Sequence, residues 1–216
     1  MTEKISGFVK PDNINQKTIR LDYLEMFKNY IKSGDVYQFG VYSGVSIRNI
    51  LCKYRQFNLI NNVWGFDSFC GLPLETKENI AYEVWNEGEF SSCDYLDVNN
   101  PVEAANILKN QIQKEYPEYS LEMIVGFYNE TLKACDVSKM KPASWVDIDV
   151  DLYSSTIDVL EFMITNKLIV SGTLVYCDDW KGIEFGEGRA FLEISNKYNL
   201  KSNRLIGEGE VLFQIL

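Results

Sequence analysis

Residues 145–153 read Trp-Val-Asp-Ile-Asp-Val-Asp-Leu-Tyr, a β-prone apolar run that passes into carboxylates. Because a charge buried without partners is costly, Trp145 to Ile148 are predicted to form a buried strand, with Asp149 and Asp151 emerging at its C-terminal end. In an open α/β sheet, ligands bind at the carboxyl ends of the strands. The stretch therefore predicts both a central strand and a binding site at its end.

A second stretch ends in the same way. Residues 173–177 are apolar and β-prone, and they run directly into Asp178 and Asp179. Two neighbouring strands that both end in carboxylates would bring several oxygen ligands around one point, and such ligands suit magnesium, calcium or manganese. We therefore expect a divalent metal and substrate site there. The alternative interpretation is helix capping, by Asp151 or Ser154 at one helix and by Asp179 at another.

Composition limits the function classes. The chain has 216 residues, 46% of them hydrophobic, and a net charge of -10. One α/β domain over residues 1–216 is the natural expectation for this length. The acidity disfavours nucleic acid and an anionic membrane surface as partners. Because no apolar run reaches the length of a membrane span and the first residues lack the apolar core of a signal peptide, we expect a cytoplasmic protein.

Histidine is absent, and the five cysteines are scattered without a Cys-x-x-Cys pair. The missing histidine excludes Ser-His-Asp and Cys-His nucleophiles and His-ligated zinc. A general base must then be Asp, Glu, Lys or Tyr, and a metal site must be rich in oxygen ligands. The cysteines are expected to be free structural thiols.

The remaining sequence alternates β-like and helical patterns. Residues 1–33 are predicted to form an irregular arm and then an amphipathic helix over 17–31, which is a candidate homodimer surface. Residues 70–98 lack clear periodicity and are interpreted as a lid or insertion. Two β-like runs, 200–205 and 210–216, predict a closing antiparallel hairpin. Further strands are expected at 35–40, 62–67 and 121–126, and helices at 45–54, 101–116, 154–168 and 187–198.

A glycine turn follows the first predicted strand. Gly40 and Gly44 lie four residues apart where the strand passes into a helix. Such a turn lets a ligand approach the backbone, and the helix N-terminus favours an anionic group, although a tight turn without a ligand fits equally well. Asp67 ends the second strand, where nucleotide-binding α/β folds use an acid to accept hydrogen bonds from a ribose. A solvated turn acid or a helix cap is the alternative for Asp67.

Several stretches together resemble the class I S-adenosylmethionine-dependent methyltransferases, in particular the macrocin O-methyltransferase (TylF/MycF-like) family. The most specific are Phe-Asp-Ser-Phe-Cys-Gly-Leu-Pro at 66–73 and Asp-Val-Asp-Leu-Tyr-Ser-Ser-Thr at 149–156. The resemblance covers the chain from about Gly34 to about Phe191. It also rests on residues 34–44, Trp85, Gly88, Phe90, Gly126, Phe127, Thr131, Leu132, Asp178 and Asp179.

The resemblance implies a Rossmann-like α/β fold, with a seven-stranded, mostly parallel sheet, helices on both faces and a C-terminal antiparallel hairpin. It implies Mg²⁺, or another hard divalent cation, bound by Asp149, Asp178 and Asp179. Gln38 stands where the family's glycine motif usually begins with Glu, and a neutral amide would act more weakly on the surroundings of the sulfonium. Contacts to S-adenosylmethionine are assigned to Gln38, Gly40, Tyr42, Gly44, Ser46, Asp67 and Ser68.

The implied reaction is methylation of a hydroxyl on a sugar or other small polar metabolite. The hydroxyl must lose a proton, and a bound divalent cation lowers the pKa of a coordinated oxygen. Three carboxylates at one point are costly without a cation between them, because like charges raise one another's pKa. Asp149 is therefore the candidate catalytic base as well as a metal ligand, while Asp151 is assigned a supporting role.

Two other functions remain open at this point. Asp149-Val150-Asp151 is also a DxD pattern, which a metal-dependent glycosyltransferase would use to hold a nucleotide sugar. A non-catalytic nucleotide-binding module of the same fold is the second, and Gln38 is the feature that suggests it.

Overall fold

The computed structural model describes residues 19–59, 61–76, 79 and 85–216. The predicted irregular arm lies outside these residues. In the described part, seven strands form one sheet in the order β3-β2-β1-β4-β5-β7-β6, and strands β1 to β5 are parallel while β7 pairs antiparallel with both β5 and β6. The strands are β1 (Asp35–Phe39), β2 (Asn62–Asp67), β3 (Ser120–Val125), β4 (Ala143–Ile148), β5 (Leu174–Cys177), β6 (Ser202–Gly207) and β7 (Val211–Ile215). The predicted fold class, including the C-terminal hairpin, is confirmed.

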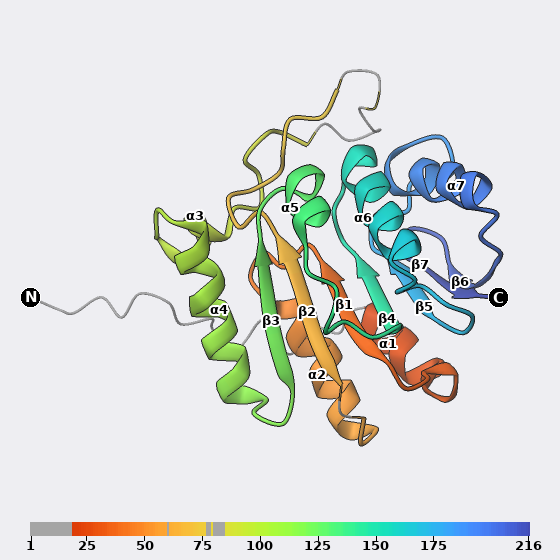
Figure 1. The fold of residues 1–216 in the computed structure, drawn as a ribbon, viewed down its shortest axis with the longest axis horizontal. Helices are drawn as coiled ribbons and strands as arrows, with labels where there is room; N and C mark the ends of the chain where they lie inside the picture. Colours follow the sequence, from red (N-terminus) through yellow and green to blue (C-terminus); the bar gives the residue numbers. More distant parts are fainter. Residues whose placement is uncertain (1–18, 60, 77–78, 80–84) are drawn as a thin grey trace, which may run out of the picture.

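Helices cover both faces of the sheet (Figure 1). One core cluster contains apolar residues of the helices α1, α2 and α4, and the other contains residues of α6 and α7 and one residue of α5. The helices are α1 (Ile19–Met26), α2 (Val45–Gln56), α3 (Ser92–Leu96), α4 (Pro101–Glu115), α5 (Tyr128–Ala134), α6 (Tyr153–Thr165) and α7 (Gly186–Tyr198), with a 3-10 turn η2 at Lys28–Tyr30. Among the described residues, no helix is both long and apolar enough to cross a bilayer.

Side-chain alternation along the central strands decides which polar groups meet. Because successive strand residues point to opposite faces, Trp145 joins the core on the α1 and α2 side while Val146 and Ile148 join the other. Asp147 therefore points toward α1. The parallel register places Gln38 beside Asp147 and Asp147 beside Tyr176, so these three side chains emerge side by side on that face.

Some elements differ from their sequence prediction. The helix expected over 17–31 ends at Met26 and is followed by the 3-10 turn, while α3 and α5 were not predicted. Both α3 and α5 are at most seven residues long, which is too short for a clear helical period. The capping interpretation of the acids is wrong, because α6 begins after Leu152 and α7 after Phe185, and neither has a side-chain cap.

The five cysteines are all free thiols, as predicted.

Candidate active site

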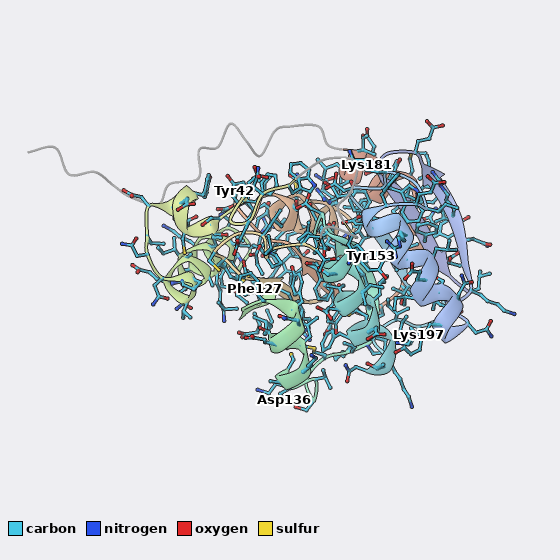
Figure 2. The ribbon with its side chains drawn as sticks, turned by 90° about the horizontal axis from the view of Figure 1, so that it is seen from above. Tyr42, Phe127, Asp136, Tyr153, Lys181 and Lys197 are labelled. Atoms are coloured by element: carbon cyan, nitrogen blue, oxygen red, sulfur yellow. The ribbon has the colours of Figure 1, made fainter. Side chains whose placement is uncertain are left out.

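A cavity of about 760 Å³ opens at the carboxyl ends of the parallel strands. Its walls come from the β1–α2 turn, the ends of β2, β4 and β5, the start of α5 and parts of the segment after β2, which Figure 1 shows above the strands. Seen from above, Tyr42 and Phe127 lie toward one side of the molecule and Lys181 and Tyr153 toward the other (Figure 2). Of these four, Tyr42, Phe127 and Lys181 line the cavity.

The β1–α2 turn forms one end of the cavity. Gly40, Tyr42 and Gly44 have φ values of 85°, 46° and 74°, and Gly44 is the N-cap residue of α2. A Cβ atom on Gly40 would overlap the main-chain oxygen of Asp149, so only glycine allows this turn to lie against the end of β4. The glycine thus joins the predicted cofactor turn to the acid site. Gly40, Tyr42 and Ser46 line the cavity, whereas Gly44 lies behind them.

Asp67 holds this turn in place. Its Oδ2 accepts hydrogen bonds from the amides of Val41 at 2.7 Å and Tyr42 at 3.0 Å, and its Oδ1 accepts from the Phe69 amide at 2.6 Å. Burial raises the pKa of Asp67, and these amides counteract the rise. Asp67 and Ser68 both line the cavity, and their contacts to a cofactor stay a prediction. Because most of the acceptor capacity of the carboxylate is used by the backbone, a ribose would compete for what remains.

Gln38 lies beneath the turn and does not line the cavity. It is fully buried, and its Nε2 donates to the Gly40 carbonyl at 2.9 Å and to Asp147 Oδ1 at 3.1 Å. A glutamate here would place a second carboxylate against the buried Asp147. The neutral amide of Gln38 therefore fits beside Asp147, and it contacts the glycine turn through the Gly40 carbonyl.

Asp149, Asp178 and Asp179 converge, as predicted. Each offers a carboxylate oxygen, and these oxygens all lie within 4.8 Å of one another, facing the cavity. Burial, followed by the charge of Asp178, raises the pKa of Asp149 far above its ordinary value, and Arg20 opposes the shift. The ends of β4 and β5 thus form one acidic, oxygen-rich centre.

Arg20 is the functional residue that sequence reasoning missed. Its Nη2 lies 3.1 Å from Asp149 Oδ2 and 2.9 Å from Asp178 Oδ1. Its Nε lies 2.7 Å from Asp147 Oδ2, an ion pair without the alignment of a hydrogen bond. Only 4% of Arg20 is exposed. The sequence signal that could have revealed Arg20 is its spacing from two apolar residues. Tyr23 and Leu24 follow it by three and four residues, so all three lie on the buried face of α1.

Two further acids support the centre. Asp151 lines the cavity in a left-handed conformation, with φ of 60°, and burial together with a hydrogen bond to Asp179 raises its pKa to about 8. Glu187, at the start of α7, is fully buried, and its carboxylate accepts from the amides of Val150 and Asp179, each at 3.2 Å. Glu187 therefore ties the loop after β4 to the loop after β5.

Aromatic side chains from the segment after β2 cover the end of the cavity that the β1–α2 turn forms. Phe90 packs edge-on against Tyr42 at 5.9 Å and against Trp85 at 5.2 Å, measured between ring centroids. All three rings line the cavity together with Pro73. The described parts of residues 70–98 thus contribute one wall, and the movement expected of a lid stays a prediction.

Comparisons with known proteins show the family and the fold of the chain. Residues 19–201 match the family model described as Macrocin-O-methyltransferase (TylF). Among solved structures, CalS11, a calicheamicin methyltransferase, is 18% identical with a TM-score of 0.68, and the O-methyltransferase NovP is 18% identical with a TM-score of 0.62; each match covers 90% of this chain and 77% of the other. An O-methyltransferase from Bacillus cereus in complex with SAH is 11% identical, covering 97% and 83%, with a TM-score of 0.53.

No curated protein matches the chain in sequence. At these identities the solved structures establish the Rossmann-like methyltransferase fold, and the family model, which spans most of the chain, establishes the family. The chain therefore belongs to the macrocin-O-methyltransferase (TylF) family of S-adenosylmethionine-dependent O-methyltransferases.

Proposed function

We propose that this enzyme methylates a hydroxyl of a sugar or other small polar metabolite, with the assistance of Mg²⁺ or another hard divalent cation. The observation that carries the proposal is the convergence of Asp149, Asp178 and Asp179 on one point of the cavity that also holds the glycine turn. Gly40 lies against the Asp149 backbone, so a methyl donor on the turn would lie next to an acceptor at the acids.

The donor set fits a divalent cation. All three proposed ligands are carboxylates, which hard cations prefer. Within the described cluster, Arg20 and Lys181 oppose the charge of Asp147, Asp149, Asp178 and Asp179, so negative charge remains in excess. A bound cation would supply the Lewis acidity that lowers the pKa of an acceptor hydroxyl.

The cofactor end is assigned to the predicted residues. Gly40, Tyr42, Ser46, Asp67 and Ser68 line the cavity and are proposed to contact S-adenosylmethionine directly. Gln38 and Gly44 are proposed to shape the turn from behind. The proposed role of Asp67 is to orient the amides of the turn, and a contact to the ribose would be a second role.

The acceptor proton needs a base near the acids. Methyl transfer breaks a carbon–sulfur bond and forms a carbon–oxygen bond, while the hydroxyl proton moves to the protein. Asp149 remains the base proposed from sequence, although Arg20 already holds its Oδ2. Asp151 is the second candidate, because it lines the same cavity without contacting Arg20 and is not one of the three convergent carboxylates.

The described cavity wall is rich in carboxylates. Outside the acid centre, the described wall also includes Glu75, Glu89, Glu130 and Asp158, and its one basic residue is Lys181. Like charges across an interface suppress binding. A neutral or cationic acceptor, such as an amino sugar, would meet no like charge on the described wall apart from Lys181.

The test combines binding and transfer. We expect calorimetry to show S-adenosylmethionine binding, and radiolabelled methyl groups to reach members of a panel of neutral and amino sugars. Addition of EDTA should stop transfer and Mg²⁺ should restore it. A nucleotide sugar serves as the control for the glycosyltransferase alternative. Binding of the nucleotide sugar alone would refute the proposal, and cofactor binding without transfer to any acceptor would favour the non-catalytic module.

A further inference from the structure

One guanidinium group connects the N-terminal helix to the proposed metal ligands. Arg20 on α1 contacts Asp149 Oδ2 at 3.1 Å and Asp178 Oδ1 at 2.9 Å, although these residues lie 129 and 158 positions away in the chain. The Tyr176 hydroxyl also donates to Asp178 Oδ1, at 2.7 Å. Asp149 and Asp178 therefore each have one oxygen occupied by Arg20.

We propose that Arg20 sets how tightly the acid centre binds a divalent cation, by occupying one oxygen of Asp149 and one of Asp178 and by placing a permanent positive charge beside the ion. This inference rests on the proposed metal site. Because Arg20 holds Asp149 Oδ2 and Asp178 Oδ1, the second oxygen of each carboxylate, together with Asp179, would be left to hold an ion. The positive charge of Arg20, at hydrogen-bonding distance from two of the proposed ligands, weakens the attraction of the acid centre for a metal cation.

The structure holds Arg20 firmly in this position. Its guanidinium carbon lies 4.6 Å above the centre of the Tyr176 ring, and its Nε pairs with Asp147 Oδ2 at 2.7 Å. Asp147 is in turn held by Gln38 at 3.1 Å and by the Trp145 indole at 3.2 Å. Because Asp147 is fully buried, the ion pair keeps Arg20 from leaving when a metal ion arrives.

The ion pair of Arg20 with Asp147 allows the effect of each charge on cation affinity to be tested separately. Arg20 lies in contact with two ligands, whereas Asp147 lies behind it, away from the cavity. Removing the Arg20 charge should therefore tighten cation binding, and removing the Asp147 charge should weaken it. Removing both should give an intermediate affinity, because the two changes oppose each other.

The experiment measures Mn²⁺ binding to the full chain by electron paramagnetic resonance, at one fixed pH and without cofactor. We expect the Kd of Arg20→Met to fall at least tenfold below wild type, that of Asp147→Asn to rise, and that of the double variant to lie between them. Arg20→Lys is the matched control, since it retains the charge. Its Kd should lie closer to wild type than that of Arg20→Met, although a lysine does not reproduce the forked contacts of the guanidinium. Circular dichroism checks the fold of each variant.

The outcomes separate this inference from the proposed function. Mn²⁺ binding by every variant with the same Kd, or weaker binding by a folded Arg20→Met, would overturn the role of Arg20 and leave the metal site standing. No Mn²⁺ binding by any variant would overturn both. Should Arg20→Met fail to fold, the double variant carries the test, because it removes both charges of the buried Arg20–Asp147 pair together, and its Kd must then lie below that of Asp147→Asn.

Discussion

Asp67→Ala tests whether the acid after β2 organises the cofactor end of the cavity. The substitution removes the acceptor of the Val41, Tyr42 and Phe69 amides, which donate at 2.7, 3.0 and 2.6 Å. An orphaned buried donor costs ~1–3 kcal/mol. Since water can enter the loosened turn and satisfy part of the loss, we take the lower value for each amide and expect the free energy of unfolding to fall by about 3 kcal/mol.

Cofactor affinity should fall together with stability. The Gly40 and Tyr42 backbone that Asp67 orients lines the cofactor end of the cavity. We expect the Kd for S-adenosylmethionine to rise by roughly 5- to 150-fold, the equivalent of ~1–3 kcal/mol. Urea unfolding followed by tryptophan fluorescence measures the first change, and isothermal titration calorimetry measures the second.

The matched control for Asp67→Ala is Glu130→Ala. It also removes a carboxylate from the cavity wall, but from α5 instead of from the end of β2. We expect near wild-type stability and affinity for this variant. Wild-type behaviour of Asp67→Ala in both assays would refute the reasoning, and so would equal losses in the two variants.

Three other perturbations address separate parts of the molecule. Asp149→Asn should lower kcat by about 10²–10⁴-fold. It should leave S-adenosylmethionine affinity nearly unchanged, because the side chain faces the acids and not the glycine turn. Full turnover by this variant would exclude Asp149 as base and as ligand. Gln38→Glu should lower the free energy of unfolding by ~1–3 kcal/mol near neutral pH by placing a second carboxylate against Asp147, with Gln38→Met as the uncharged control; equal urea midpoints for the two would contradict this. Burial raises the pKa of Tyr116 and of Tyr119 to about 12, so the native state binds more protons than the unfolded chain above pH 10. The stability contributed by these tyrosines is complete below pH 10 and lost as pH rises toward 12; an absorbance titration at 295 nm that places both pKa values at 10 would contradict the prediction.

The buried group of Gln38, Asp147 and Arg20 gives the unusual glycine motif a physical explanation. Gln38 donates to Asp147, and Asp147 pairs with Arg20, which reaches the acid centre. A glutamine at position 38 is compatible with a buried aspartate at 147, whereas two adjacent carboxylates would require one of them to be protonated. The Gln38 amide, which suggests a non-catalytic nucleotide-binding module, is therefore also accounted for by its packing against Asp147.

Much of the fold and part of the site could be predicted from local patterns. The alternation of apolar runs with helical periods predicted an α/β domain, and the two runs after residue 200 predicted the hairpin; the order of the strands in the sheet came from the structure. Parallel strands place their carboxyl ends at one edge, so Asp149, Asp178 and Asp179 were expected together and are together. The short helices α3 and α5 were missed because fewer than two full turns leave little periodicity to detect.

The sequence by itself determined the sheet, the glycine turn and the acids that end β4 and β5, because each depends on residues that are neighbours in the chain or on a general rule of parallel sheets. Only the tertiary structure decided which group pairs with those acids and which group accepts hydrogen bonds from the amides of that turn. Arg20 reaches Asp178 across 158 positions, and Asp67 reaches the Val41 amide across 26. Burial makes such pairings obligatory, yet no local pattern records which distant partner supplies them.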